Sequence, residues 1–275
     1  MKHTLSRGAK VSCVTKSGVA TIKPKLFERR DTVKKKVLLF DIETAPLLGY
    51  TWGKWEQNVI EFKRDWYILS FACKWLGEKK VYWYGLPSFP GYHRHKEDDK
   101  ALVKKLWEFF DEADVLIGHN GDRFDIKKTN TRFVIHKLKP PSPSESIDTL
   151  KIARSRFAFV SNKLDDVCFT LGIGRKLPHE GKYTWLGCMG GDPKAWATME
   201  RYNRNDVFPL LEGLYLYLRA WDKSSLAIAT EGCPKCACEK FQKRGTRKLA
   251  NGWQKPRHRC HECGHWYLGP KERSF

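Results

Sequence analysis

The chain has 275 residues and a net charge of +20 at pH 7, with the basic excess concentrated at both ends. Residues 1–36 hold eleven Lys and Arg against two acids, and residues 229–275 hold eleven against four. This length suits one α/β core of about 200 residues with a small appendage, and no apolar run is long enough to span a membrane. Basic ends indicate a polyanionic partner, because neutralising phosphates releases condensed counterions. A basic tail kept for solubility is the simpler alternative.

Nine cysteines are present, and five of them lie within residues 233–263 as two CxxC pairs with Cys238 alongside. The N-terminal residues lack the apolar core of a secretory signal peptide, although the absence of acids from residues 1–27 leaves a transit peptide as an alternative. Scattered cysteines in a reducing compartment are mostly small buried hydrophobic residues. We therefore expect an intracellular protein, either cytoplasmic or associated with the nucleoid.

The first half of the chain predicts strands before helices. Residues 1–36 mix Lys, Ser, Gly and Thr without periodicity and are expected to form a flexible arm. Val37–Phe40 is a short apolar run that ends in acidic residues, a pattern typical of a buried central strand. Runs rich in β-forming residues at 67–75 and 81–84 predict a hairpin, and the Pro- and Gly-containing segment 85–95 predicts a loop.

Helices and strands then alternate. Helical periodicity is present at 97–113 and at 125–138, with a short buried strand at 115–118 between them and another strand near Ile147. Ser161 is expected to cap a helix that Gly172 ends. A glycine-rich stretch at 181–191 predicts a loop before a long helix at 192–221. Pro209 lacks an amide hydrogen, so that helix should bend just after Asp206.

This order of elements predicts an α/β fold, in which helices flank a mixed β-sheet. We assign the sheet and its helices to a domain at residues 37–224. A linker is expected at residues 225–232. It overlaps the start of a small C-terminal module, which we assign to residues 229–275.

Four acidic residues and one tyrosine lie where predicted strands or helices meet polar sequence. Asp41 and Glu43 are two apart on a strand and share a face, while Tyr202 and Asp206 are four apart on a helix and project together. Asp125 opens a helix after a buried strand, at the end of the sheet where α/β proteins bind ligands. Carboxylates bind Mg²⁺, and two such ions can promote attack of water on a phosphodiester. The residues therefore predict a metal-dependent nuclease.

These residues stand, in chain order, in the motifs DIET, HN-x3-FD and Y-x3-D. The order resembles the DEDDy branch of the DnaQ-like 3′–5′ exonucleases, whose ribonuclease-H-like fold is shared with the proofreading domains of DNA polymerases. The stretch SNKLDDVCFTLGIGRK, before the third motif, is similar to the LDDV…LG stretch of those domains. The resemblance covers about residues 37–220. Each motif alone is weak evidence, and the resemblance rests on the occurrence of all three motifs in the same order as in the family.

The resemblance also implies a role for each residue. Asp41 would bridge two Mg²⁺ or Mn²⁺ ions, with Glu43 and Asp206 on the ion that activates water. Asp125 would bind the second ion largely through solvent. Tyr202 would position the attacking water, because a pKa of ~10 makes it a poor base near neutrality. The residues that would shape a pocket for the terminal nucleotide are His119, Asn120 and Phe124.

The C-terminal cysteine pairs, Cys233/Cys236 and Cys260/Cys263, are separated by 23 residues of basic, strand-like sequence. This CxxC…CxxC arrangement is typical of a zinc ribbon, in which four thiolates close a tetrahedral shell around a structural ion. Cys238 in place of Cys236, a nearby histidine ligand, or a redox dithiol are the alternatives. Basic and aromatic residues alternate across this module, which favours contact with nucleic acid. The residues expected to contact DNA are Lys243, Arg244 and Arg247.

The leading hypothesis is a 3′–5′ exonuclease that acts on single-stranded DNA or frayed ends, in a replication or repair complex of a microbe or virus. An exoribonuclease or a structure-selective endonuclease of the same fold are alternatives, because nothing identifies a 2′-hydroxyl contact. An alternative of another class is a non-catalytic zinc-ribbon protein that binds nucleic acid. Trp52 and Trp55, in a basic and aromatic segment, would either line a groove for the strand or pack against the domain.

Overall fold

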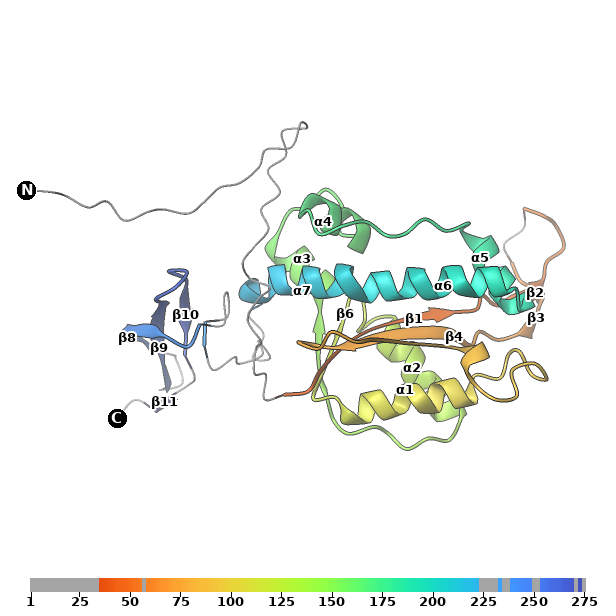
Figure 1. The fold of residues 1–275 in the computed structure, drawn as a ribbon, viewed down its shortest axis with the longest axis horizontal. Coiled ribbons are helices and arrows are strands. Elements are labelled where there is room, and N and C mark those ends of the chain that lie inside the picture. Colours follow the sequence, from red (N-terminus) through yellow and green to blue (C-terminus); the bar gives the residue numbers. More distant parts are fainter. Residues whose placement is uncertain are drawn as a thin grey trace, which may run out of the picture.

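The computed structural model describes residues 35–55, 58–222, 232–233, 238–248, 253–269 and 272–273. Within them, a five-stranded sheet carries helices on both faces, and a second, smaller sheet forms near the C-terminus (Figure 1). The predicted arm lies outside the described residues except for Lys35 and Lys36, which pair with Glu145 and Glu112. The predicted linker also lies outside them, apart from Gly232, so the domain limits stay a prediction.

The main sheet is mixed, as predicted. Its strand order is β5-β4-β1-β6-β7, with β1 at the centre, antiparallel to β4 and parallel to β6. The strands are β1 (Val37–Thr44), β4 (Ile68–Trp75), β5 (Val81–Gly85), β6 (Val115–Gly118) and β7 (Glu145–Asp148). Strands β4 and β5 form the predicted antiparallel hairpin.

Helices cover the two faces of this sheet. One face carries α1 (Lys100–Glu112) and α2 (Asp125–Ile135), and a short 3₁₀ turn, η2 (Leu86–Ser88), lies in the predicted loop. The other face carries α3 (Thr149–Arg156), α4 (Leu164–Thr170), α5 (Lys182–Gly190) and α6 (Pro193–Asn205), then η3 (Asp206–Leu211), α7 (Glu212–Leu218) and η4 (Arg219–Trp221). Of the helices that the structure describes, none has the length and apolarity that a membrane crossing requires.

The side chains of β1 point alternately to the two faces of the sheet, and this alternation decides which face carries the acidic pair. Leu38 and Phe40 belong to the apolar cluster that includes α1, whereas Val37 and Leu39 belong to the cluster that includes α4 and α7. Since side chains alternate along a strand, Asp41 and Glu43 continue the face of Val37 and Leu39. That face is buried along the sheet and becomes acidic at its end.

The long C-terminal helix bends where the sequence predicts. Helix α6 ends at Asn205, and Phe208, just before Pro209, has non-helical angles of φ −143° and ψ 122°. The helical path continues through α7. Asp206 therefore lies at the junction, where the ordinary helical hydrogen bonding is interrupted.

Two local predictions were wrong. Helix α4 begins at Leu164 rather than near Ser161, whose hydroxyl accepts a 3.3 Å hydrogen bond from the backbone of Lys163 outside the helix. The predicted loop at 181–191 is the helix α5. Its Gly187 serves packing, because a Cβ there would lie 2.7 Å from the Cβ of Ala195 on α6, and Gly191 ends the helix with φ +89°.

A two-stranded hairpin follows β1, formed by β2 (Leu48–Tyr50) and β3 (Glu61–Arg64), an element that no sequence pattern predicted. The C-terminal sheet is antiparallel, and β9 (Trp253–Cys260) pairs with each of its other three strands. Those strands are β8 (Phe241–Lys248), β10 (Trp266–Leu268) and β11 (Glu272–Arg273).

Candidate active site

Three acidic side chains, two from β1 and one from a distant part of the chain, meet at the end of β1. Carboxylate oxygens of Asp41, Glu43 and Asp206 all lie within 4.8 Å of one another. The strand presents Asp41 and Glu43 on one face, and the bend after α6 directs Asp206 toward them. Asp206 is only 1% exposed, so its charge requires compensation from its neighbours or from an ion.

Asp125 joins this group from the other side of β1. It opens α2, and its Oδ1 accepts a 3.2 Å hydrogen bond from the backbone N–H of Ile42, the residue between Asp41 and Glu43. Its charge contributes to the raised pKa of both neighbours. The structure therefore brings together all four predicted carboxylates, three of them with oxygens within 4.8 Å of one another and Asp125 beside them.

Crowding perturbs these acids strongly. Burial, then the charge of Glu43, raises the pKa of Asp41 well above its usual range. Burial, then the charge of Asp206, raises the pKa of Glu43 to about 8, and burial raises the pKa of Asp125 to about 7. Oδ1 of Asp206 is buried with no hydrogen-bond partner in the described part of the chain. An oxygen-rich, charge-repelling pocket of this kind fits a divalent cation.

A lysine that the sequence analysis missed completes the cluster. Nζ of Lys176 donates hydrogen bonds to Oδ2 of Asp206 at 2.6 Å and to the Tyr202 hydroxyl at 2.7 Å. Burial alone would lower the pKa of Lys176, but the charges of Asp206 and Tyr202 and their hydrogen bonds to the lysine together outweigh burial and raise that pKa. Asp165 fixes the lysine backbone through a 2.7 Å hydrogen bond to its N–H. The only sequence signal was its place in the GIGRK stretch.

Tyr202 lies in an aromatic setting. Its ring centroid is 4.8 Å from that of His179 and 5.9 Å from that of Trp185, both edge-on. Burial and the charge of Asp206 raise the pKa of Tyr202, so its hydroxyl stays protonated near neutrality. Trp185 also donates a hydrogen bond to Glu43, which ties α5 to the acidic strand.

Asn203 is a second group that the sequence analysis missed. Its side chain is fully buried, and Nδ2 donates to Oδ2 of Asp41 at 2.7 Å. Its Oδ1 accepts a 3.2 Å hydrogen bond from the hydroxyl of Ser70 on β4. The amide thus fixes the orientation of Asp41 from α6.

A cavity of about 480 Å³ opens beside the end of β1. Lys128 stands at its wall, with Nζ 3.9 Å from the ring centroid of Trp66 and 5.1 Å from that of Phe124. The residues that line it are Thr44, Ala45, Pro46, Leu47, Trp66, Phe124, Lys128, Lys182, Trp185 and Leu186. Trp185 and Thr44 connect this cavity to the carboxylates, since Trp185 binds Glu43 and Thr44 follows it.

Residues 77–216, slightly over half of the chain, match the family model of the RNase_H superfamily. The chain belongs to the RNase_H superfamily. The matched range contains Asp125, Tyr202 and Asp206, and it begins after β1. Membership supports a nuclease activity in general and, with it, the use of divalent metal ions and the binding of nucleic acid.

Two polymerases are similar to this RNase_H superfamily chain. One is the DNA polymerase III PolC-type of Ureaplasma parvum serovar 3, 39% identical over 71 residues, which are 26% of this chain and 5% of that protein. The other is the solved family B DNA polymerase of the hyperthermophilic archaeon Pyrobaculum calidifontis, with a TM-score of 0.49 and 17% identity, over 78% of this chain and 31% of that one. The chain thus spans a small part of either polymerase.

The three residues predicted to shape a nucleotide pocket have different surroundings in the structure. Phe124 lines the cavity. Both ring nitrogens of His119 are occupied, Nδ1 with the Thr149 hydroxyl and Nε2 with the carbonyl of Asn162, each at 2.9 Å. Asn120 adopts φ +68°, and its N–H donates to Asp148 at 2.9 Å. His119 therefore supports the loop after β6, and substrate contact by His119 or Asn120 stays a prediction.

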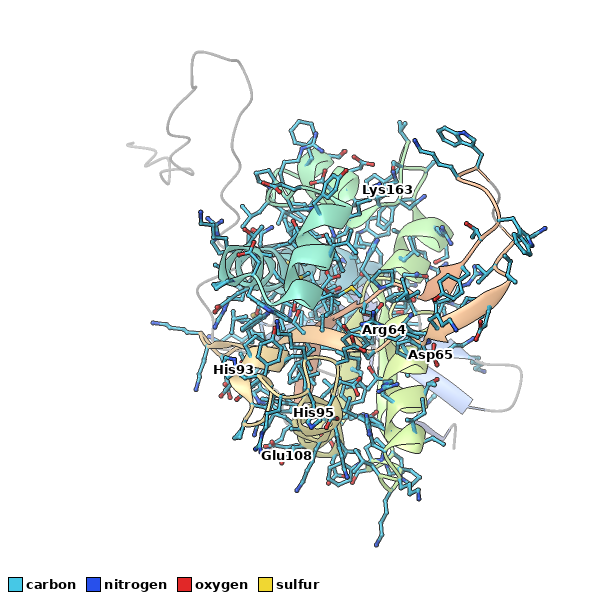
Figure 2. The ribbon with its side chains drawn as sticks, turned by 90° about the vertical axis from the view of Figure 1, so that its right-hand side faces the viewer. Arg64, Asp65, His93, His95, Glu108 and Lys163 are labelled. Carbon is cyan, nitrogen blue, oxygen red and sulfur yellow. The ribbon has the colours of Figure 1, made fainter. Side chains whose placement is uncertain are left out.

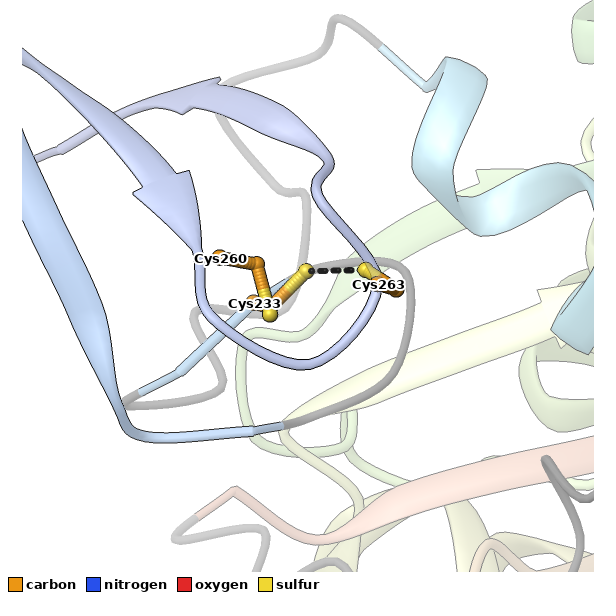
Figure 3. Close-up of side chains that lie close together, drawn as sticks. All are labelled: Cys233, Cys260 and Cys263. Carbon is orange, nitrogen blue, oxygen red and sulfur yellow. Dashed lines mark hydrogen bonds between the residues drawn. The ribbon is translucent and has the colours of Figure 1, made fainter. Parts of the chain in front are cut away.

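The C-terminal sheet carries a cysteine cluster. Sulfur atoms of Cys233, Cys260 and Cys263 lie within 4.8 Å of one another, and those of Cys233 and Cys263 are 3.6 Å apart (Figure 3). Cys236 lies outside the described residues. Cys238 is buried, and its sulfur donates to the carbonyl of Lys240 at 3.7 Å. The cluster is compatible with a zinc ribbon.

The basic residues predicted to contact DNA face solvent. Lys243, Arg244 and Arg247 are exposed on β8, where their contact with DNA stays a prediction. His258 is buried, and its ring stacks on that of Phe241 with centroids 4.0 Å apart. That histidine is part of the small core of the module.

Proposed function

We propose that this chain is a metal-dependent 3′–5′ exonuclease of the DEDDy type that hydrolyses DNA at single-stranded or frayed ends. The observation that carries the proposal is the convergence of Asp41, Glu43 and Asp206 within 4.8 Å, with Asp125 bound to the same strand. Tyr202 and Lys176 border this group. Superfamily membership supports nuclease activity in general, and the direction of attack and the choice of DNA are our proposals.

The four carboxylates would hold two Mg²⁺ or Mn²⁺ ions, which when bound lower the pKa of water and stabilise a leaving 3′-oxygen. The side chains of the protein then have separate tasks. Tyr202, protonated near neutrality, positions the attacking water through its hydroxyl. Lys176 holds Tyr202 and Asp206 in one geometry and brings a positive charge to a site where negative charge develops.

The adjoining cavity would receive the terminal nucleotide. Its volume of about 480 Å³ lies in the usual range for ligand sites. Phe124, Trp66 and Trp185 offer aromatic surfaces for a base, while Lys128 and Lys182 offer cations for phosphates. A base enclosed in this way cannot remain paired, which is why we propose unpaired ends as the substrate.

The C-terminal module would assist binding. We propose one structural Zn²⁺ held by Cys233, Cys236, Cys260 and Cys263, with Lys243, Arg244 and Arg247 contacting phosphates without sequence preference. Such a module would lengthen the residence of the enzyme on DNA. A role in a replication or repair complex, in the cytoplasm or nucleoid of a microbe or in a virus-infected cell, is part of the same proposal.

The test is a digestion of matched DNA and RNA oligonucleotides, labelled at either end, with Mg²⁺ or Mn²⁺. We expect a 5′-labelled DNA strand to shorten stepwise from its 3′ end, while a 3′ label is released at once as a mononucleotide. Cleavage of a closed circular strand would favour an endonuclease, and preference for RNA would favour an exoribonuclease.

The matched variant is Asp41→Asn, which removes one charge with little change of shape. Hydrolysis should be abolished while binding to the oligonucleotide persists. If Asp41→Asn left all measurable activity intact, the protein would be a binding module with an inactive core.

A further inference from the structure

The β2–β3 hairpin leaves an unusual amount of apolar surface uncovered. Eight apolar side chains between residues 47 and 62 are at least 40% exposed, and Trp52 and Trp55 are 83% and 85% exposed. The others are Leu47, Leu48, Tyr50, Val59, Ile60 and Phe62. Monomeric proteins seldom expose this many large apolar side chains on one element unless the element binds something.

This surface belongs to an ordered element. The backbone N–H of Ile60 donates to the carbonyl of Tyr50 at 2.8 Å, and Gly49 permits a close approach, because a Cβ there would lie 2.5 Å from Val59. Arg64 ties the base of the hairpin to Glu97. Figure 2 shows the hairpin projecting from the domain, with Arg64 and Asp65 near its base. Tyr50 and Phe62 are therefore presented on paired strands, and Trp52 and Trp55 lie in the segment between them.

Cations accompany the exposed rings. Nζ of Lys63 lies 4.8 Å from the ring centroid of Tyr50, and Nζ of Lys54 lies 5.2 Å from that of Trp55. The same pairing recurs in the cavity, between Lys128 and Trp66. Alternating rings and ammonium groups complement single-stranded nucleic acid, whose bases stack on aromatic faces while its phosphates bind cations. An apolar surface of a protein partner would gain nothing from the lysine ammonium groups beside these rings.

The hairpin is continuous with the cavity. Pro46 and Leu47 line the cavity, and β2 begins at Leu48, directly after them. Both elements extend from the end of β1 that carries Glu43. The eight residue-to-residue steps from Thr44 to Trp52 can span at most about 26 Å, a distance that suits the low end of single-strand binding sites, on the order of four nucleotides.

We propose that the β2–β3 hairpin is a grip for single-stranded DNA, in which Trp52, Trp55, Tyr50 and Phe62 stack on bases upstream of the terminal nucleotide. The inference rests on the proposed function, because it places the 3′ end of the strand in the cavity. The grip holds the unpaired strand along the hairpin and guides it toward the carboxylates.

The test measures binding apart from cleavage. In an Asp41→Asn background, the double variant Trp52→Ala/Trp55→Ala should weaken binding of labelled oligodeoxythymidylate about 10- to 100-fold, by fluorescence anisotropy. The loss should grow with length from two to twelve nucleotides, and blunt duplex DNA should be affected least. Trp52→Phe/Trp55→Phe should retain most of the affinity, because the ring faces remain.

The control is Trp221→Ala, since Trp221 is 55% exposed on η4. This turn directly follows α7, which ends far from β2 and β3 (Figure 1). It should bind all oligonucleotides as the parent does. Unchanged affinity of the Trp52/Trp55 double variant at every length would overturn the grip. So would a change in its oligomeric state by analytical ultracentrifugation without a change in DNA binding. Absence of cleavage by the unmutated protein would contradict the proposed exonuclease activity. The effect of the Trp52/Trp55 double variant on DNA binding could still be interpreted.

Discussion

The side-chain amide of Asn203 donates a 2.7 Å hydrogen bond to Oδ2 of Asp41, across 162 positions of sequence. It also reaches the backbone oxygen of Asp41 at 3.3 Å. One buried amide thus determines which way the central carboxylate faces and links α6 to β1. Because Ser70 satisfies the other end of the amide, the orientation of Asn203 is itself determined by β4.

Replacing Asn203 by Ala should impair hydrolysis without abolishing folding. Removing a hydrogen-bond partner from a carboxylate that binds metal typically costs 10- to 100-fold in metal affinity or activity. The unpaired Ser70 hydroxyl and Asp41 oxygen should also lower the free energy of unfolding by about 1–3 kcal/mol. Titration of activity with Mg²⁺, together with urea unfolding, separates the two effects. A variant with the parental Mg²⁺ midpoint and rate would show that Asn203 has no positioning role.

Lys176→Met should lower kcat by about 100-fold, because it removes the cation that joins Asp206 to Tyr202. Lys176→Arg should recover part of the rate, since it retains the charge with a different reach. Single-turnover kinetics on a labelled single strand measures both. The matched control is Lys194→Met, an exposed lysine in the first turn of α6. Equal rates for Lys176→Met and Lys194→Met would contradict the assignment.

The raised carboxyl pKa values predict a pH-dependent stability in the absence of divalent metal. Unfolded Glu and Asp ionise near ~4.3 and ~3.9, whereas the pKa values of Glu43 and Asp125 in the folded protein are about 8 and about 7. Between these limits the folded state binds more protons, so the free energy of unfolding must fall as pH rises. The thermal midpoint in EDTA should therefore decrease from pH 5 to pH 9.

Two further measurements test whether the buried carboxyl groups cause this pH dependence of stability. Glu43→Gln should flatten the decrease, because it removes one repelling charge. Added Mg²⁺ should restore stability most at high pH, where binding need not displace protons. A thermal midpoint that rises with pH in EDTA would refute the explanation.

Zinc removal should affect the C-terminal module first. Metal analysis should find one zinc per chain, and Cys260→Ser should lose it, because three thiolates rarely close a structural site. Cys238→Ser should keep the zinc, since the Cys238 sulfur bonds to a carbonyl outside the cluster. If Cys238→Ser lost zinc while Cys236→Ser kept it, Cys238 would be the fourth ligand instead of Cys236.

Local patterns predicted the sheet well. The runs at 37–40, 81–84 and 115–118 are short and apolar, and each is a strand in the structure. The acidic pair at 41 and 43 needed only the two-residue period of a strand to share a face. Prediction of secondary structure failed at residues 181–191, where glycine serves helix packing as well as helix termination. The glycines of 181–191 pack α5 on α6 and end the helix, yet glycine runs usually indicate loops.

Strand and helix periodicity are properties of neighbouring residues, so the sequence was enough to pair Asp41 with Glu43 and Tyr202 with Asp206. That these pairs belong to one site was implied by the family resemblance. Tertiary structure alone decided that Lys176 would bind Asp206, that Asn203 would orient Asp41, and that β2 and β3 would project exposed rings beside the cavity. Those contacts depend on how the bend after α6 and the turn at the end of β1 direct distant segments toward one point. The contacts of Lys176 and Asn203 therefore could not be predicted from their positions in the sequence.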